Sequence, residues 1–247
     1  MGCGLSIEQL TLGYGEVTAV QHLDCRIAPG SLTAVVGPNG AGKSSLLKAV
    51  AGVLKPLAGD VRLAASRQDQ IAYLPQQSEL DRSFPVSVID VIGMGLWKEI
   101  GPFGRLTCEQ KSRIGDVIST VGLDGLETRP VSSLSGGQMQ RVLFARLLLQ
   151  DAPLILLDEP FTAIDMRTLA DLLAIIQRWN CEGRTVLVVL HDLDIVRANF
   201  PETLMLAREL VAHGRTELVL TAENRFRARQ MCEACAGPPH TCGRSAA

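Results

Sequence analysis

The sequence predicts an α/β fold in which helices cover both faces of a parallel sheet. Short apolar runs, each of strand length, recur along the chain at residues 5–12, 32–36, 71–74, 154–157, 186–190 and 204–206. Several of these runs are apolar at every position, which is typical of strands buried on both faces of a parallel sheet. Helical patterns at residues 43–51, 166–181 and 192–199 supply the cover that such a sheet requires.

A second pattern begins near residue 85. From residue 85 to residue 150 the strand signals vanish and helix-like spacing takes over, with breaks at 101–104 and at Arg129-Pro130. We expect an inserted helical subdomain over 85–150, within a single domain over 1–231 whose catalytic core comprises 1–84 and 151–231. The remaining residues, 232–247, form a Cys-rich tail. A chain of 247 residues is long enough for one such large domain.

Charge and hydropathy exclude several classes of protein. The formal net charge of −2 offers no overall basic surface, so nucleic acid is not an expected partner. The richest apolar stretch, residues 142–157, is interrupted by Arg146 and Asp151 and is shorter than the roughly 20 apolar residues that span a bilayer. No secretory signal is recognisable at the N-terminus, and most of the seven cysteines are scattered singly, as in reduced proteins. We therefore expect a cytoplasmic chain.

A glycine-rich loop follows the predicted strand at 32–36 and opens the predicted helix at 43. In this context such a loop is typical of phosphate binding, because its glycines allow successive backbone N–H groups to point at phosphate oxygens. Lys43 is expected to reach the β- and γ-phosphates of ATP, and Ser44 to ligate Mg²⁺. The candidate nucleotide-binding residues here are Gly37, Pro38, Asn39, Gly40, Ala41, Gly42, Lys43, Ser44 and Ser45.

Two carboxylates end the apolar strand predicted at 154–157. In parallel sheets this is the edge at which ligands bind. Asp158 is the expected Mg²⁺ partner, directly or through water, and Glu159 is placed to act as general base on the attacking water. In isolation an exposed acidic turn would be the better interpretation of this pair, but the neighbouring phosphate loop favours a catalytic role.

A further glycine-rich segment opens another helix. Its core-facing residues are expected at Met139, Val142, Leu143 and Leu147, which leaves the helix N-terminus pointing outward as an anion site. From the residues alone, a structural helix cap is the better interpretation. The candidate binding residues are Ser135, Gly136, Gly137 and Gln138.

These three motifs, in this order, resemble those of the ATPase subunit of an ABC transporter, and the resemblance covers almost the whole chain. It implies the ABC ATPase fold, a P-loop NTPase core with an antiparallel β edge, and a head-to-tail dimer that encloses two ATP molecules. In that dimer Ser135 to Gln138 would bind the γ-phosphate held by the opposite subunit. The resemblance also assigns Tyr14 to adenine, Gln76 to Mg²⁺ and the attacking water, His191 to the γ-phosphate, and Asp165 to communication between the sites.

A transport function requires membrane partners, because nothing in this chain is expected to cross a bilayer. A free-standing ATPase is more typical of importers, which combine integral permease subunits with an extracytoplasmic binding protein. The ATPase would then lie peripherally on the inner face of the cell membrane. Residues 73–76, 84–95 and 159–165 resemble the ATPases of zinc, manganese and iron(II) importers, although Ala163 stands where that group usually has Gly.

Three alternatives remain open at this point. Iron-chelate importers are close rivals, since the resembling residues would face the nucleotide and the permease and never the cargo. A non-transport ABC ATPase of DNA repair or translation would usually carry two cassettes or a long coiled coil. A regulatory protein with an inactive site would be expected to lack one of Lys43, Asp158, Glu159 or His191, and all four are present.

The tail carries a possible second metal site. Cys232, Cys235, His240 and Cys242 offer three thiolates and one imidazole, a set suited to tetrahedral Zn²⁺. The alternative is a Cys-bearing tail that binds no metal.

Overall fold

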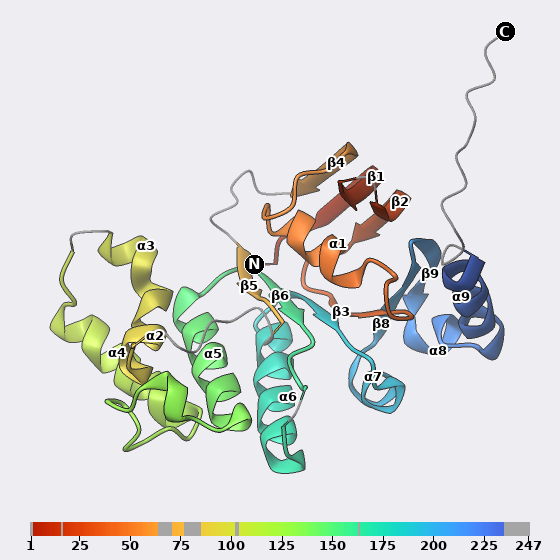
Figure 1. Ribbon diagram of the computed structural model, residues 1–247. Helices are drawn as coiled ribbons and strands as arrows, with labels where there is room; N and C mark the ends of the chain where they lie inside the picture. Colours follow the sequence, from red (N-terminus) through yellow and green to blue (C-terminus); the bar gives the residue numbers. More distant parts are fainter. Residues whose placement is uncertain are drawn as a thin grey trace, which may run out of the picture. The chain divides into compact units, whose positions relative to one another are not determined.

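The computed structural model describes residues 2–15, 17–63, 71–76, 85–101, 104–162 and 164–234 (Figure 1). These residues divide into two compact units. One comprises Met1–Gly4, Ala28–Leu32 and Leu63–Leu190, and is called unit 1 below; the other, unit 2, comprises Leu5–Ile27, Thr33–Arg62 and His191–Ala247.

Unit 1 contains a parallel sheet in the order β5 (Ile71–Leu74), β6 (Leu154–Asp158) and β7 (Thr185–Val189). Every residue of β6 and β7 is buried, which agrees with their uninterrupted apolar sequences. These strands lie within one residue of the predicted ranges. The carboxyl end of β6 therefore emerges beside that of β7, and this is where Asp158 and Glu159 lie.

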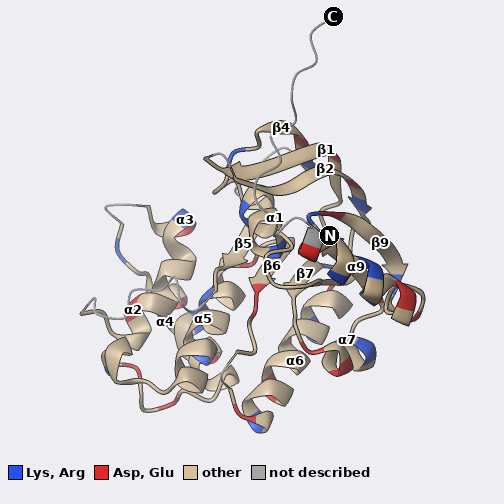
Figure 2. Ribbon diagram, turned by 45° about the vertical axis from the view of Figure 1, so that its right-hand side comes forward, with Lys and Arg blue, Asp and Glu red and all other residues tan. Residues whose placement is uncertain are grey.

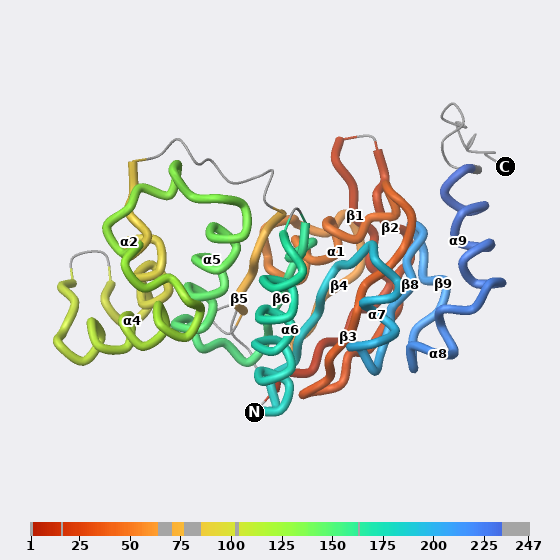
Figure 3. Tube along the Cα trace, turned by 90° about the horizontal axis from the view of Figure 1, so that it is seen from below, coloured from red at the N-terminus to blue at the C-terminus, as the bar shows by residue number. Residues whose placement is uncertain are grey.

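The helical part of unit 1 contains the helices within residues 85–150, where the sequence shows helix-like spacing, together with α6. Its elements are α2 (Val88–Gly93), η3 (Met94–Leu96), α3 (Trp97–Ile100), α4 (Cys108–Thr120), η4 (Val131–Ser133), α5 (Gly136–Gln150) and α6 (Met166–Cys181). Helix α5 lies beside both α2 and α4 (Figures 1 and 3). Gly95 allows η3 to approach α5 closely, since a Cβ there would lie 2.4 Å from the carbonyl oxygen of Arg146.

Local sequence explains where these helices start. Ser87, Thr107 and Ser135 each cap the helix that follows, and each forms a reciprocal capping box with the residue three positions on. Within the core of unit 1, the fully buried ring of Trp179 in α6 stacks on Phe144 of α5, with ring centroids 5.7 Å apart. Helices α5 and α6 are thus joined by an aromatic contact.

Unit 2 holds an antiparallel sheet in the order β2 (Val17–Ile27), β1 (Leu5–Tyr14) and β4 (Ala58–Leu63). It also holds the parallel pair β3 (Leu32–Val36) and β8 (Glu202–Ala207), with β9 (Glu209–Arg215) antiparallel to β8. Its helices are α1 (Lys43–Val50), α7 (Leu193–Asn199), α8 (Thr216–Val219) and α9 (Ala222–Ala234). Helix α9 lies along β8 and β9 (Figures 1 and 3).

The sequence analysis predicted an antiparallel β edge but did not locate β2, β4 or β9. Strand β2 alternates buried and exposed residues, and its exposed positions are largely polar, so it carries no continuous apolar run. Strand β4 is mostly exposed. Half-buried antiparallel strands give a weaker signal than buried parallel ones, which explains the omission.

Charged residues of both signs occur along helices α6 and α7 (Figure 2). In the part of the chain that the structure describes, no helix is both long and apolar enough to cross a membrane. The cysteines described there, at positions 3, 25, 108, 181 and 232, are free thiols, as predicted for the four that are scattered singly. Burial raises the pKa of the Cys25 thiol to about 12, so this cysteine is a core residue without reactivity near neutral pH.

Candidate nucleotide-binding site

The phosphate loop lies in unit 2, between β3 and α1, as predicted. Lys43 is the first residue of α1 and is almost fully buried, with 6% of its surface exposed. Its ammonium donates hydrogen bonds to the carbonyl oxygens of Gly37 and Pro38, both at 2.9 Å. The loop therefore curls around its own lysine, which fixes the cation beneath the loop backbone.

Glycine is required at specific points of this loop. Gly37, Gly40 and Gly42 have φ angles of 153°, 76° and 90°, which L-residues rarely adopt. A Cβ at Gly37 would lie 2.0 Å from the carbonyl oxygen of Leu206, and one at Gly42 would lie 2.4 Å from Cγ2 of Val20. A Cβ at Gly40 would meet nothing within 4 Å, because this residue is exposed.

The loop thus presents an outward-facing backbone at Asn39 and Gly40, with a buried ammonium beneath it and a helix N-terminus behind it. Backbone donors, a helix dipole and a fixed cation together form a cradle for an anion. The residues fit the triphosphate of ATP. Ser44, partly exposed in the first turn of α1, offers the hydroxyl oxygen that Mg²⁺ ligation requires.

The acidic pair lies in unit 1 at the end of β6. Asp158 is buried, with 1% of its surface exposed, and its carboxylate oxygens are of the kind that Mg²⁺ prefers. Glu159 adopts a left-handed backbone with φ of 50°, and its N–H donates to the carbonyl oxygen of Val189 at 3.2 Å. A non-glycine residue in this conformation is uncommon and often marks a functional position.

The structure brings Gln76 and Glu159 together, although they are far apart in the sequence. The side-chain amide of Gln76 donates a hydrogen bond to Oε2 of Glu159 at 2.9 Å. This bond orients the carboxylate that the sequence analysis assigned as general base. A base whose direction is fixed by a second residue is the arrangement that acid–base catalysis needs.

The second glycine-rich segment opens α5, also in unit 1. Ser135 Oγ accepts from the N–H of Gln138 at 3.2 Å, and the Gln138 side chain accepts from the N–H of Ser135 at 3.0 Å. Gly136 and Gly137 are the first two residues of this 15-residue helix, where backbone N–H groups have no partner within the helix itself. The predicted core residues Met139, Val142, Leu143 and Leu147 are all buried, so the N-terminus points outward as expected.

Asp165 lies against this helix start, which the sequence did not predict. Its carboxylate caps α6, accepting from the N–H of Thr168 at 2.9 Å and from the Thr168 hydroxyl at 2.8 Å. These two hydrogen bonds, the backbone one first, hold the pKa of Asp165 below its usual range. A Cβ at Gly137 would lie 3.4 Å from Thr168 Oγ1 and 3.6 Å from Asp165 Oδ2.

The remaining predicted residues of unit 2 are exposed. Tyr14 ends β1 with 51% of its surface exposed, so its ring is available for stacking on a planar ligand. His191 is exposed just before Asp192, the residue that caps α7.

The tail site falls largely outside the described residues. Cys235, His240 and Cys242 are not among them, and Cys232 is a partly exposed residue of α9. Over the described ranges, no group of three or more His, Cys, Asp or Glu residues could hold a metal ion.

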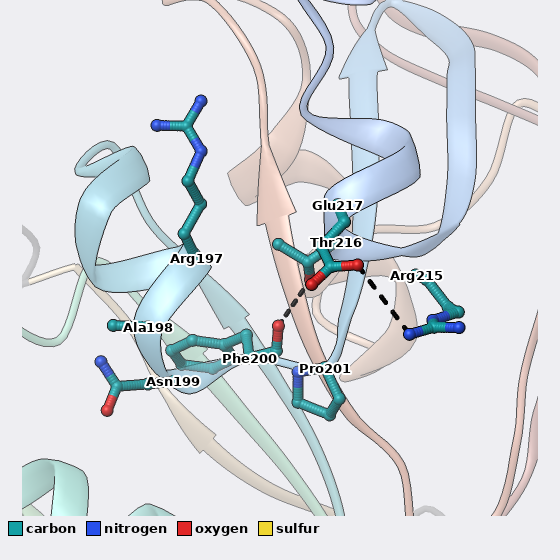
Figure 4. Close-up of a pocket in the computed structure, with 8 residues that line it drawn as sticks. All are labelled: Arg197, Ala198, Asn199, Phe200, Pro201, Arg215, Thr216 and Glu217. Carbon is teal, nitrogen blue, oxygen red and sulfur yellow. Dashed lines mark hydrogen bonds and ion pairs between the residues drawn. The ribbon is translucent and has the colours of Figure 1, made fainter.

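One hollow in unit 2 contains none of the predicted residues. It has a volume of about 370 Å³ and lies between the end of α7 and the start of α8 (Figure 4). The buried Thr216 hydroxyl donates to the carbonyl oxygen of Phe200 at 2.5 Å, and Arg215 lies 3.9 Å from Glu217. Both contacts are parts of the local fold.

A phosphate loop after a parallel strand, together with paired carboxylates at the end of another, defines a nucleotide-binding protein of the P-loop class. The family model described as ABC transporter matches residues 20–162. The chain belongs to the ABC transporter family.

Relatives of similar length support this membership. The manganese transport system ATP-binding protein MntB of Listeria monocytogenes is 39% identical over 89% of this chain and 93% of its own. The zinc transport system ATP-binding protein TroB of Treponema pallidum is 38% identical over 89% of this chain and 84% of its own. The manganese transport system ATP-binding protein MntA of a Synechocystis strain is 36% identical over 89% and 87%.

Solved structures agree with the fold. A transporter assigned to the metal-chelate type of ABC transporters, in an inward-facing conformation, has a TM-score of 0.79 at 31% identity, covering 92% of this chain and 90% of that one. An ATP-binding cassette of an ABC transporter in its ADP conformation has a TM-score of 0.76 at 21% identity, covering 93% and 99%. The predicted fold class is confirmed.

Proposed function

We propose that this chain is the ATP-hydrolysing subunit that powers an ABC importer for a divalent metal ion, zinc or manganese. The observation that carries the hydrolytic part is the hydrogen bond from Gln76 to Glu159, because it orients a carboxylate directly after the buried Asp158. The metal cargo is supported by relatives named for manganese and zinc transport at 36–39% identity. We take residues 1–231 as one ATPase domain, with its helical part at 85–150.

In the proposed mechanism the loop from Gly37 to Ser45 binds the triphosphate, and Tyr14 stacks on adenine. Lys43 neutralises charge on the β- and γ-phosphates. Ser44 and Asp158 would hold Mg²⁺, which when bound helps to offset the charge that develops during phosphoryl transfer.

Glu159 accepts the proton of the attacking water in this scheme, and Gln76 keeps its carboxylate directed. His191 contacts the γ-phosphate. The Gln76 amide donates to Oε2 of Glu159 at 2.9 Å, and in this scheme the other carboxylate oxygen accepts the proton of the water.

We propose that Ser135 to Gln138 serve the ATP held by a second copy of the chain in a head-to-tail dimer. The N–H groups of Gly136 and Gly137 at the start of α5 and the Ser135 hydroxyl are donors suited to a γ-phosphate. Mixing a Lys43→Ala chain with a Ser135→Arg chain gives one dimer site with both halves intact. Activity above that of either variant alone is expected; its absence would count against a shared site.

Membrane subunits are the proposed partners of the helical part of unit 1. Exposed apolar side chains gather there at Ile89, Met94 and Trp97, and large exposed apolar groups mark contact surfaces. Through these subunits the chain would lie on the inner face of the cell membrane, and an extracytoplasmic metal-binding protein would deliver the cargo. Trp97→Ala should uncouple hydrolysis from transport in the assembled complex while leaving nucleotide affinity unchanged.

The metal content of cells tests which cargo the importer carries. A strain that lacks this chain should lose growth and cellular zinc or manganese under metal limitation, and wild-type chain should restore both. A variant with Glu159→Gln should restore neither. If the strain instead lost only uptake of iron chelates, the iron-chelate importer would replace this assignment; unchanged contents of all metals would favour a non-transport ABC ATPase.

We further propose zinc binding by Cys232, Cys235, His240 and Cys242, on the basis of ligand type and spacing alone. A chain truncated after Met231 should lose about one zinc per chain, and affinity of the full chain should fall at low pH as the ligands take up protons. Equal zinc content in the truncated and full chains would exclude the site.

A further inference from the structure

We propose that Arg141 is a positioning residue. Its side chain fixes the first turn of α5 relative to Asp165, which caps α6, and relative to the C-terminal end of α4. This inference rests on the proposed role of the α5 N-terminus in ATP hydrolysis. It adds a residue that neither the motifs nor the resemblance assigned, and one that acts through other groups without touching nucleotide.

The Arg141 side chain reaches from α5 to two other elements of unit 1, the end of α4 and the first turns of α6. One terminal nitrogen donates to the carbonyl oxygen of Val121 at 2.7 Å, and the other lies 2.6 Å from Asp171 Oδ2 and 3.4 Å from Thr168 Oγ1. The side chain is 17% exposed, whereas that of Asp171 is 48% exposed. A guanidinium that is mostly shielded from water, with a carboxylate and two further oxygen acceptors, is a firmly held group.

The Thr168 hydroxyl links Arg141 to Asp165. Its hydroxyl donates to Asp165 Oδ2 at 2.8 Å and can accept from Arg141 at the same time. Thr168 is buried, with 5% of its surface exposed, so water does not readily replace either partner. The orientation of the Asp165 carboxylate is therefore linked to the guanidinium through one hydroxyl group.

Thr168 and Asp165 also lie beside the start of α5. Gly137 lies against Thr168 and Asp165, where a Cβ would be in contact with both side chains. Arg141 follows Gly137 by four residues, so the two lie on one face of the helix. A change at Arg141 should therefore displace the turn whose N–H groups are proposed to bind the γ-phosphate.

The hydrogen bond to Val121 connects Arg141 to helix α4. Val121 is the C-cap residue of α4, where carbonyl oxygens lack partners within the helix. Arg141 supplies a donor at this terminus and brings positive charge to the negative end of the helix dipole. One side chain thus joins α4, the start of α5 and the start of α6.

The chemistry favours arginine over lysine here. Three acceptors in different directions suit the planar fork of a guanidinium, whereas an ammonium is a compact point charge. Arg141 also borders a groove of about 720 Å³ in unit 1, so its replacement by lysine does not leave a sealed cavity. Arg141→Lys should fold, which makes it a usable probe.

The test uses the full-length chain and two readouts. Backbone hydrogen exchange without nucleotide reports the positioning directly: Arg141→Lys and Thr168→Val should each raise exchange about five- to tenfold in peptides covering 134–143 and 165–172. Exchange in a phosphate-loop peptide covering 37–50 should stay unchanged. In ATPase assays both variants should lower kcat about 10- to 100-fold while the affinity of the chain for ATP changes less than about twofold.

Two controls separate positioning from a general loss of structure. Arg178→Lys alters an arginine that lines the same groove but pairs with Glu182 on the exposed side of α6, so it should behave as wild type. Thr168→Ser keeps the hydroxyl and should restore both exchange and kcat. If Arg141→Lys and Thr168→Val leave exchange at the α5 start unchanged, the inference is wrong, even if the wild-type chain hydrolyses ATP. If exchange rises as expected but the wild type has no ATPase activity, the positioning role stands and the proposed function fails.

Discussion

Replacing Gly37 by alanine should destabilise this chain more than the same change at Gly40, three residues away in the same loop. Both glycines have positive φ angles, so each alanine would be strained by about 1–2 kcal/mol. Their surroundings differ. A Cβ at Gly37 would lie 2.0 Å from the Leu206 carbonyl oxygen, and one at Gly40 would meet nothing within 4 Å.

The size of the difference follows from this contact. To bring the alanine Cβ to an acceptable distance from the Leu206 carbonyl oxygen, the loop and β8 must move apart by about 1 Å. In overpacked cores such a displacement costs about 1–3 kcal/mol of stability. Gly40→Ala should lower Tm by about 2–8 °C, given about 2–4 °C per kcal/mol for a chain of this size. Gly37→Ala, at a total of about 2–5 kcal/mol, should lower Tm by about 4–20 °C.

Thermal unfolding of the two variants beside wild type measures the effect, and nucleotide affinity measured on the same samples reports the loop. Gly37→Ala should also lose most ATP binding, because the carbonyl oxygens of Gly37 and Pro38 hold Lys43 in place. Equal Tm values for the two variants would refute the packing of this loop on β8.

Two further perturbations test other parts of the structure. Trp179→Ala removes a fully buried ring stacked on Phe144 and should cost about 3–5 kcal/mol in urea unfolding, whereas Trp97→Ala, at an exposed position, should cost less than about 0.5 kcal/mol; similar costs would contradict the assigned core. Asp165→Asn tests the lowered pKa of Asp165, because the folded state prefers the ionised carboxylate. Wild type should exceed the variant in free energy of unfolding by a constant amount above about pH 5, and this difference should shrink as pH falls below about 4. A stability difference that does not change over pH 3–6 would show that Thr168 does not stabilise the carboxylate.

The parts that the sequence predicted are those with strong local signals. Strands β6 and β7 are apolar except at their end residues Asp158 and Thr185, and the phosphate loop combines glycines with Lys43 and Ser44 between a strand and a helix. In these segments the neighbouring residues alone determine the local structure, and tertiary contacts do not change it. The start of α5 was predicted together with its buried face for the same reason.

Contacts between distant segments could not be predicted in this way. Nothing in the sequence near Gln76 indicates that its amide meets Glu159, and the left-handed backbone of Glu159 has no glycine to mark it. Arg141 was equally inconspicuous, although its spacing of four residues from Gly137 places it on the same helix face. Tertiary structure determines these pairings, and only the identities of their members can be read from the sequence.

The central claim is that Glu159 acts as the base of an ATPase, and the most direct test compares steady-state ATP hydrolysis by wild type and by Glu159→Gln. The amide keeps the shape of the side chain but cannot accept the proton, so turnover should fall by about 10² to 10⁴ while ATP affinity is retained. The variant should accumulate as an ATP-bound dimer in size-exclusion chromatography. Near-wild-type hydrolysis by Glu159→Gln would contradict the account.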